Sequence, residues 1–446
     1  ASEKRNEQVN YSLSCRDAFQ VHDKSNEPQI VLAEAGTGVG KTLGYIAPAS
    51  LWAEKNDGTV WISTFTRNLQ RQLDFELDRL FPDAQEKARR VVIRKGRENY
   101  FCLLNFEESL YQNPVSSPGS WTTLGLMARW ILHTRDGDMR GGDFPGWLKD
   151  LLGAGLTTNL TDTRGECIYS SCRHYRRCFI EHTVRRADSA DIVVANHALI
   201  MFQVALGSLR GNNIKPEIRM PIRYIFDEGH HLFDAADNAF SVHLTARETA
   251  ELRRWLLGAE SGNRTRSKGL RERIKDLIAG DDETTELLDE VLKSAQFLPT
   301  TGWINRLGKN GNIGLFETFF TLVRSQVYAR DVNEPYGYSL ETDTLSPIDG
   351  LEEIASRLDI ALSKLKKPLF QLIVALTKML DKDAETLDSQ TRNRIETVCL
   401  SLDRRACQPI DAWRQMLKDL GGIQLEEIVD WFSVERIDRR DFDVGL

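Results

Sequence analysis

The segment AEAGTGVGKT (33–42) is the strongest indication of fold class in this sequence. A short apolar run, QIVLAEA (29–35), leads into it, and residues from Thr42 onward place apolar side chains at helical spacing. A strand, a glycine-rich loop and a helix form the setting that a phosphate-binding loop requires. The sequence therefore predicts a nucleotide site, although Ala35 occupies the position of the first glycine in the usual pattern.

This loop contains the groups that bind a polyphosphate. Its backbone N–H groups can surround the phosphates, because glycines allow a close approach. The N-terminus of the following helix favours an anion. Lys41 would supply a positive charge to the β- and γ-phosphates, and the Thr42 hydroxyl would bind Mg²⁺. The expected nucleotide-binding residues of the loop are Ala35, Gly36, Thr37, Gly38, Val39, Gly40, Lys41 and Thr42.

A second motif, FDEGHHL (226–232), follows another apolar run, RYIF (223–226). Asp227, at the end of an expected strand, suits Mg²⁺ through a bound water. Glu228 suits a base that orients and activates an attacking water, since positioning and charge stabilisation carry most of phosphoryl transfer. The two adjacent carboxylates therefore complement the loop upstream.

Short apolar runs at 59–65, 90–96, 191–196 and 223–228 alternate with helical stretches. Buried strands that alternate with helices indicate an α/β fold with a doubly wound parallel sheet. Residues 98–187 interrupt this rhythm with four cysteines and turn-rich stretches, so we expect an insertion there. The long amphipathic segments that follow the second motif indicate a mostly helical second half.

The chain has 446 residues, a net charge of −7 and an isoelectric point of about 5.8. Its length predicts two to four domains. The acidity excludes a global basic field but not a local basic groove. The opening residues, ASEKRNEQVN, contain no apolar signal-peptide core, and no run of 18 apolar residues exists. We therefore expect a cytoplasmic protein without membrane association.

Four of the seven cysteines lie in the expected insertion. An odd number of cysteines in a long, cytoplasmic chain disfavours a disulfide framework. Cys102 follows KGRENYF, and GECIYSSCRHYRRC supplies Cys167, Cys172 and Cys178. Four thiolates can bind Zn²⁺ or an iron–sulfur cluster, but zinc sites usually use C-x2-C pairs, which are absent. The spacing therefore favours a cluster over zinc, and buried unreactive cysteines remain the alternative.

Together these motifs resemble the superfamily 2 helicases and, among them, the XPD/DinG family, especially its bacterial DinG-like members. The resemblance rests on the alanine at the first loop position, the DEAH-like box at 227–230, the pattern KGRxNYxC with three clustered cysteines, and ADIVVANHALI (190–200). Arg5 and Gln8 resemble the R-x-x-Q of the family's Q-motif, whose glutamine reads the adenine edge. STFTRNLQRQL (63–73) resembles motif Ia, which contacts the DNA backbone.

The resemblance implies an ATP-dependent DNA helicase, in which ATP hydrolysis drives translocation along single-stranded DNA and duplex unwinding, 5′ to 3′, in repair or replication. It implies ATP, Mg²⁺ and a [4Fe–4S] cluster as cofactors, and single-stranded and forked duplex DNA as partners. The implied ligands are Cys102, Cys167, Cys172 and Cys178 for the cluster and Thr42 and Asp227 for Mg²⁺. The implied catalytic residues are Lys41, Asp227, Glu228 and His230, and Arg5 and Gln8 join the loop in binding nucleotide.

The resemblance also implies a domain organisation. Residues 1–97 and 188–238 would form a RecA-like domain, 98–187 an iron–sulfur domain and 239–446 a helical arch-like domain. The sequence contains neither a Q-x-x-G-R-x-x-R element nor an S-A-T element, so we expect the N-terminal part of a longer, monomeric helicase without its second RecA-like domain. Because an arginine finger contributes a factor of roughly 10³ to 10⁵ to turnover, we expect this part alone to be inactive or weakly active.

Two basic segments flank the cysteines, KARRVVIRKGR (87–97) and RHYRRCFIEHTVRR (173–186). Phosphates can pair with the basic side chains and bases can stack on aromatic ones, so these segments predict a path for single-stranded DNA. The interleaved aromatics are Tyr100, Phe101, Tyr169, Tyr175 and Phe179. The alternative function is a metal-stabilised module that binds single-stranded nucleic acid and nucleotide without turnover. A different P-loop enzyme, such as a kinase or transporter ATPase, fits the cysteines and the R-x-x-Q poorly.

Overall fold

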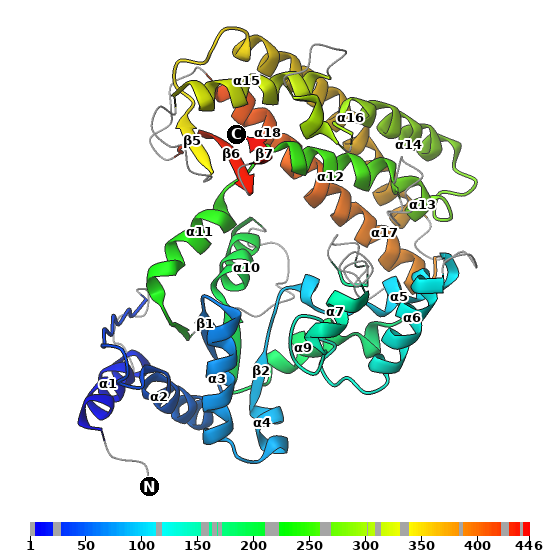
Figure 1. Cartoon of the computed structure of the whole chain (residues 1–446). Coiled ribbons are helices and arrows are strands. Elements are labelled where there is room, and N and C mark those ends of the chain that lie inside the picture. The colour runs from blue at the N-terminus through cyan, green and yellow to red at the C-terminus, as the bar shows by residue number, and fades with distance from the viewer. Residues whose placement is uncertain are drawn as a thin grey trace. The chain divides into compact units, whose positions relative to one another are not determined.

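The computed structural model divides the chain into two compact units (Figure 1). Unit 1 comprises Ala1–Cys167 and Cys172–Ser241, and unit 2 comprises Ile168–Ser171 and Val242–Leu446. Each unit has hydrophobic core clusters of its own. The structure describes residues 5–20, 28–112, 118–152, 160–162, 167, 172–209, 223–258, 269–300, 302–307, 314–330, 339–382, 387–420, 428–437 and 440–446.

A parallel four-stranded sheet forms the centre of unit 1. Its strands are β1 (Val60–Thr64), β2 (Val91–Ile93), β3 (Ile192–Asn196) and β4 (Tyr224–Phe226), in the order β2-β3-β1-β4. All three neighbouring pairs are parallel, and Ile62 lies opposite both Val194 and Ile225. The α/β class and the parallel sheet predicted from the sequence are therefore confirmed.

Helices cover both faces of this sheet. Successive residues of a strand point to opposite faces, so Ile62 and Val194 pack in one core cluster while Trp61 and Val193 pack in another. Helices α2 and α3 contribute to the first cluster, and α10 contributes to the second. The helical elements around the sheet are α1 (Asn6–Arg16), η1 (Asp17–Phe19), α2 (Lys41–Asn56), α3 (Arg67–Leu80), α4 (Ala84–Arg90), α9 (Phe179–Ala187), α10 (His197–Leu209), η6 (Gly229–His231) and α11 (Leu232–Phe240) (Figure 1).

The run QIVLAEA (29–35), expected as the strand before the loop, is not a strand. Ile30 and Leu32 are 76% and 94% exposed. Within the described ranges β4 pairs with β1 alone, so the run forms no ladder with the other edge of β4. An apolar run becomes a strand through packing and pairing rather than through composition alone. The helix expected after the loop from Thr42 onward is present as α2, which begins one residue earlier, at Lys41.

The segment between β2 and β3 forms a small, mainly helical subdomain. Its elements before α9 are η2 (Arg97–Asn99), α5 (Leu103–Gln112), α6 (Pro118–Ile131), α7 (Gly146–Leu152) and η4 (Tyr175–Arg177). Isolated bridges join Tyr100 to Asp138 and Phe101 to Thr161. The buried residues of its core are Phe101, Leu124, Met127, Met139, Phe144, Leu148 and Leu160. The chain that leads to Cys102 therefore runs through the centre of this subdomain.

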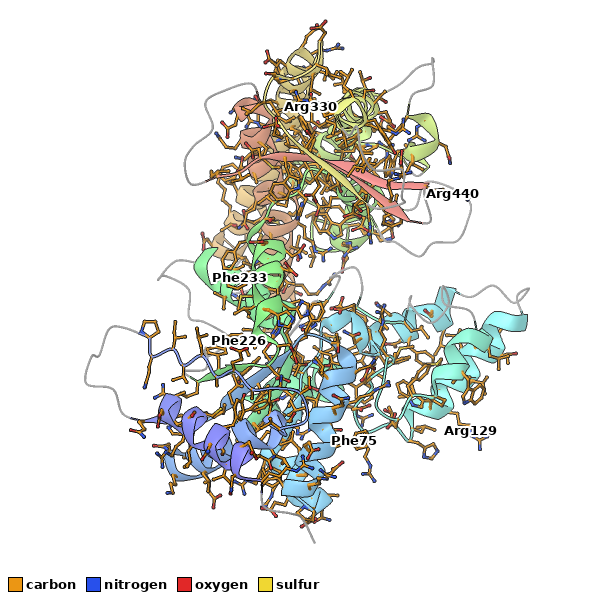
Figure 2. All side chains as sticks on the ribbon, turned by 60° about the vertical axis from the view of Figure 1, so that its left-hand side comes forward. Phe75, Arg129, Phe226, Phe233, Arg330 and Arg440 are labelled. Carbon is orange, nitrogen blue, oxygen red and sulfur yellow. The ribbon has the colours of Figure 1, made fainter. Side chains whose placement is uncertain are left out.

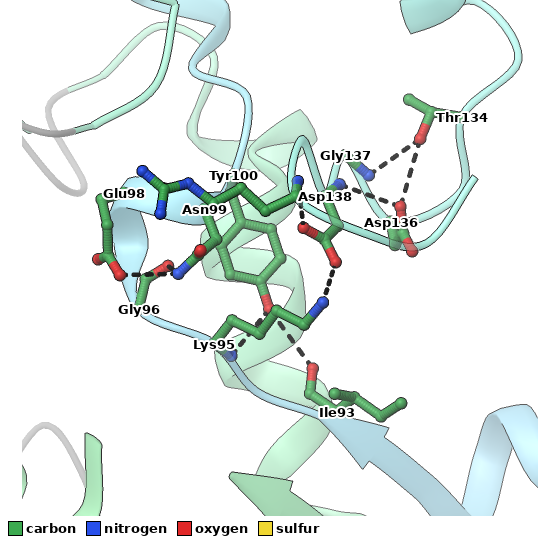
Figure 3. Close-up of polar contacts among 11 residues, drawn as sticks. Ile93, Lys95, Gly96, Glu98, Asn99, Tyr100, Thr134, Asp136, Gly137 and Asp138 are labelled. Carbon is green, nitrogen blue, oxygen red and sulfur yellow. Dashed lines mark hydrogen bonds and ion pairs between the residues drawn. The ribbon is translucent and has the colours of Figure 1, made fainter. Parts of the chain in front are cut away.

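Lys95 and Tyr100 join the subdomain to the end of β2, as Figure 3 shows. The Lys95 amino group pairs with the buried carboxylate of Asp138. The Lys95 backbone N–H donates to the Tyr100 hydroxyl at 3.2 Å, and that hydroxyl donates to the carbonyl of Ile93 at 3.4 Å. Asp136 accepts a hydrogen bond from the Asp138 N–H at 3.0 Å. These contacts fix the start of the segment KGRENYFC.

Unit 2 is mainly helical, with one antiparallel sheet in the order β5-β6-β7. Its longest helix, α16, has 32 residues and buries Leu358, Leu362, Leu365 and Leu369 at helical spacing. The sheet, in which Leu340 lies opposite Val434, was not predicted. The elements are α12 (Ala246–Leu257), α13 (Leu270–Ile274), α14 (Asp282–Ser294), η7 (Ala295–Phe297), η8 (Trp303–Arg306), α15 (Leu315–Arg330), β5 (Leu340–Asp343), α16 (Leu351–Lys382), α17 (Ser389–Leu402), η9 (Asp403–Cys407), α18 (Gln408–Asp419), β6 (Trp431–Ile437) and β7 (Arg440–Gly445).

Candidate functional site

Two glycines in the left-handed conformation turn the chain into α2. Gly38 has φ 85° and Gly40 has φ 84°, a region that other residues enter only with strain. Gly40 is also the N-cap of α2, and no side chain caps that helix end. The N–H groups of the first turn are therefore left for a bound anion, as a phosphate loop requires.

Arg5 and Gln8, more than thirty residues upstream, hold the backbone of this loop. The Arg5 guanidinium donates to the Gly38 carbonyl at 2.9 Å, and the Gln8 amide donates to the Gly40 carbonyl at 3.0 Å. Helix α1, which carries Gln8, packs closely on α2. The approach is close enough that a Cβ at Gly44 would lie 2.6 Å from the Tyr11 ring. The structure thus brings the R-x-x-Q to the loop, and here the Gln8 amide supports the loop itself.

The carboxylate pair lies directly after β4 and reaches the loop. Phe226, labelled in Figure 2, ends the strand, and the Asp227 N–H donates to the Ser63 carbonyl at 2.8 Å. Lys41 Nζ lies 3.7 Å from a Glu228 carboxylate oxygen, and His230 Nδ1 lies 3.5 Å from the other. Lys41, Glu228 and His230, predicted separately, are therefore neighbours.

Glu228 adopts a left-handed backbone conformation, with φ 55°. This conformation costs free energy for a residue other than glycine, and such strain concentrates at functional sites. The next residue, Gly229, has open space where a Cβ would stand. Alanine would therefore fit at the position where this box differs from the DEAH pattern.

Oxygen donors suited to Mg²⁺ surround a buried tyrosine at this site. Burial raises the pKa of Asp227 and drives that of Tyr45 far above its ordinary value. The Tyr45 hydroxyl lies against Thr42 and Asp227, yet it makes no hydrogen bond of standard geometry with any described residue. Mg²⁺ prefers hydroxyl and carboxylate oxygens, and a bound cation would reverse the effect of burial on Asp227. Thr42 and Asp227 therefore fit the ion in chemical type.

Burial raises the pKa of two of the four cysteines in the subdomain. Burial raises the pKa of Cys102 to about 12, with a smaller contribution from Cys167, and Cys178 likewise contributes to the raised pKa of Cys172. The Arg97 guanidinium donates to the Cys167 sulfur at 2.8 Å. Across the part of the chain that the structure describes, no group of three or more His, Cys, Asp or Glu side chains is arranged to hold a metal ion. The geometry therefore does not assemble a complete four-thiolate site.

The basic segment 87–97 is largely neutralised by acidic partners. Lys87 contacts Asp74 and Asp78, each at 2.6 Å, and Arg90 contacts Asp191 at 2.5 Å. Lys95 and Arg97 pair with Asp138 and Asp162. These side chains form ion pairs within the fold. The structure therefore does not support the prediction that this segment binds the phosphates of single-stranded DNA.

The aromatic residues predicted to stack on bases have different environments. Tyr100 and Phe101 are 3% and 0% exposed, so the prediction that bases stack on them is wrong. Phe179 packs against the core of the subdomain. Tyr175 lies beneath the guanidinium of Arg185, 5.1 Å from its ring centroid, and Tyr169 lies outside the described residues. The sequence pattern alone could not distinguish a core aromatic from a stacking platform.

Sequence reasoning assigned no role to His197, which begins α10 inside ADIVVANHALI. Its Nδ1 lies 2.6 Å from the Ser63 hydroxyl, and burial lowers its pKa. A histidine directly after an apolar strand run was the available signal, because the carboxyl ends of parallel strands meet at the edge where ligands bind.

Comparisons with known proteins agree with these motifs. The chain is 30% identical to the ATP-dependent DNA helicase YoaA of Haemophilus influenzae over 251 residues, which is 56% of this chain and 36% of that protein. It is 31% identical to YoaA of Escherichia coli over 240 residues, 53% of this chain and 35% of that protein. This chain is a homologue of the DinG and YoaA helicases. The predicted resemblance to bacterial DinG-like proteins is therefore confirmed.

A third relative matches a longer part of the chain. The ATP-dependent DNA helicase DinG of Photobacterium profundum is 29% identical over 305 residues, 67% of this chain and 41% of that protein. The chain thus spans well under two thirds of the length of these relatives. No family model matches the chain. Among the described residues, no helix combines the length and apolar character needed to cross a membrane.

Proposed function

We propose that this chain supplies the ATP-binding and catalytic carboxylate half of an ATP-dependent DNA helicase. ATP hydrolysis would drive translocation along single-stranded DNA and unwinding of duplex, including forked, DNA. The observation that carries this proposal is the convergence of Lys41, Glu228 and His230 beside a loop held by Arg5 and Gln8. The relatives named as helicases support the same assignment.

The residues of the chain suggest how the site responds to nucleotide. Lys41 and Glu228 are each about one-third exposed, so their ion pair is weak and easily exchanged. A bound triphosphate would draw Lys41 toward its β- and γ-phosphates and leave the Glu228 carboxylate free to take a proton from water. Thr42 and Asp227 would hold Mg²⁺, which offsets negative charge on the phosphates. Nucleotide binding would thus free the Glu228 carboxylate that hydrolysis requires as a base.

We also propose that Cys102, Cys167, Cys172 and Cys178 hold a [4Fe–4S] cluster. The presence of four thiols in this segment and the absence of C-x2-C pairs among them support this. Since the described geometry is incomplete, no step of the reaction is assigned to the cluster. Anaerobically purified protein should be brown and contain iron and sulfide; colourless protein with stoichiometric zinc would refute the assignment.

The remaining assignments come from the family resemblance. We propose translocation from 5′ to 3′, a role in DNA repair or replication, a cytoplasmic location and a monomeric state. The polarity is measurable with the chain joined to whatever further domain its relatives contain, on duplexes that carry a single-stranded tail at one end or the other. Unwinding from a 3′ tail alone would overturn the proposed direction.

Nucleotide binding by the 446-residue chain tests the central proposal. We would titrate a fluorescent ATP analogue with Mg²⁺ into the wild type, Lys41→Ala and the matched control Lys55→Ala, an exposed lysine at the other end of α2. Loss of a charged contact worth about 1.5–3 kcal/mol should weaken binding about 10- to 150-fold in Lys41→Ala. Lys55→Ala should bind like the wild type.

Two outcomes would change the assignment. Equal affinity of Lys41→Ala and the wild type would refute the phosphate-loop site. Binding of both nucleotide and oligo(dT) without ATP turnover would favour the alternative, a metal-stabilised module that binds single-stranded nucleic acid. Steady-state ATPase assays with and without oligo(dT) distinguish turnover from binding alone.

A further inference from the structure

A buried histidine connects three strands at the edge of the sheet where the site lies. His197 begins α10 directly after β3 and is 1% exposed. Its Nδ1 lies 2.6 Å from the hydroxyl of Ser63, a fully buried residue of β1 that is 134 positions away in the sequence. None of the nucleotide-site motifs includes His197, and the proposed chemistry gives it no task.

Ser63 holds two partners at once. Its backbone carbonyl accepts the N–H of Asp227 at 2.8 Å, while its hydroxyl bonds His197. The position of the proposed Mg²⁺ ligand and the position of His197 are therefore set at one point of β1. Ser63 also begins the segment 63–73 that resembles a DNA-backbone contact, and residues 64–66 follow it directly.

The second ring nitrogen of His197 is unpaired. Nε2 is buried and has no hydrogen-bond partner of standard geometry among the described residues, although the ring lies against the backbone of Asp227 and Glu228. Buried polar atoms are rarely left without a partner, because that costs free energy. Nε2 can therefore gain a hydrogen bond if the backbone of the carboxylate turn shifts slightly.

An aromatic contact joins the same two regions at the surface. The Phe65 ring stacks on His231, with centroids 3.7 Å apart and planes 12° apart, and it lies 6.4 Å from the His197 ring. His231 neighbours His230, whose Nδ1 contacts Glu228. Residue 65 thus contacts η6, which directly follows the carboxylate turn, in addition to the link through Ser63 and His197.

We propose that His197 is a positioning residue that couples the carboxylate turn at 227–228 to the strand-binding segment at 64–66. The inference rests on the proposed function. In this structure Nε2 makes no hydrogen bond of standard geometry. A small shift of the turn on binding of Mg²⁺-nucleotide would let a backbone carbonyl of the turn accept the Nε2–H, and Ser63 would carry that change to residues 64–66. Coupling between two sites requires such an element with two arrangements that both ligands bias.

A double variant isolates this role from a merely structural one. Replacing only one partner of a buried hydrogen bond leaves the other unsatisfied, whereas replacing both by apolar groups is nearly neutral for stability. Ser63→Ala combined with His197→Phe keeps a ring between Phe65 and Phe226 but removes the hydroxyl and both ring nitrogens. Its unfolding midpoint should therefore stay close to that of the wild type.

The measurement is the affinity of the 446-residue chain for a fluorescent, non-hydrolysable ATP analogue with Mg²⁺, without and with saturating oligo(dT). In the wild type, oligo(dT) should change the nucleotide affinity about 5- to 150-fold. In the double variant the factor should fall to about 1, measured at concentrations at which each ligand alone still saturates the protein.

Each result then has one meaning. A double variant that retains the wild-type coupling factor overturns the proposal, as does a wild type that binds both ligands independently. A wild type that binds neither ligand overturns the proposed function and this inference with it. Should the double variant fail to fold, His197→Asn replaces it: the amide can reach the Ser63 hydroxyl but has no atom at the Nε2 position, and coupling should again be lost.

Discussion

The three glycines of the phosphate loop should respond differently to the same substitution. Alanine at Gly36 meets no atom within 4 Å and requires no left-handed backbone. Alanine at Gly38 also meets nothing, but φ there is +85°. Alanine at Gly40 faces both difficulties, since φ is +84° and its Cβ would stand 2.3 Å from Gln8 Nε2. The series therefore separates backbone strain from loss of the α1 contact.

The expected free-energy changes follow from these differences. Gly36→Ala should raise the free energy of unfolding by about 0.4–1 kcal/mol, because it restricts only the unfolded chain. Gly38→Ala adds a left-handed penalty of about 1–2 kcal/mol, for a net loss of about 1 kcal/mol. Gly40→Ala also breaks the Gln8 hydrogen bond, worth about 0.5–1.5 kcal/mol, for a net loss of about 2 kcal/mol.

Hydrogen exchange of the buried β1 amides reports these changes in unit 1 without interference from unit 2. Gly36→Ala serves as the control, since it alters composition without strain. A loss in Gly36→Ala as large as that in Gly38→Ala would show that φ does not determine the cost. Equal losses in Gly38→Ala and Gly40→Ala would show that the Gln8 contact contributes nothing to stability.

Two further predictions concern the junction before Cys102. Arg97→Ala should lower the free energy of unfolding by about 2–3 kcal/mol, because it removes the ion-pair partner of the buried Asp162 at a partly exposed site. In urea unfolding, adding Asp162→Ala to this variant should restore part of the lost free energy. No such recovery would contradict the pairing. The second prediction concerns Tyr100, whose pKa burial raises to about 12 from an ordinary value near 10. The folded state therefore keeps the phenol proton to higher pH than the unfolded state does. The free energy of unfolding should then fall between about pH 10 and 12, by up to about 1.4 kcal/mol per pH unit. Tyr100→Phe should flatten that fall in urea midpoints measured across this range, and an unchanged slope would exclude Tyr100 as its source.

Local patterns predicted the elements that carry the loop and the carboxylates. The run DIVVAN (191–196) became β3, and RYIF became β4, because both pair with β1 in the parallel sheet. The run at 29–35 is also apolar, yet it pairs with no described strand, so the local pattern failed there. The difference lies in pairing, which a local pattern does not contain.

The roles of charged and polar residues were the hardest to predict. Lys87 and Lys95 looked like phosphate contacts, but their partners Asp78 and Asp138 come from other segments and neutralise them. His197 looked like one residue of a motif, and its function becomes visible only through Ser63. In each case the decisive neighbour lies outside the motif, from 9 residues away for Asp78 to 134 for Ser63, so the spacing within the motif could not reveal it.

The contacts of α1 with the phosphate loop span fewer residues than the contact between β1 and α10, so the two halves of the nucleotide site can form at different stages of folding. Arg5 and Gln8 reach the loop across only 33 and 32 residues, whereas Ser63 meets His197 across 134. Closing the longer loop costs more chain entropy and is slower. During synthesis, the phosphate loop can therefore form soon after α2 has been made. The carboxylates of Asp227 and Glu228 reach the site only once β3 and β4 have completed the sheet.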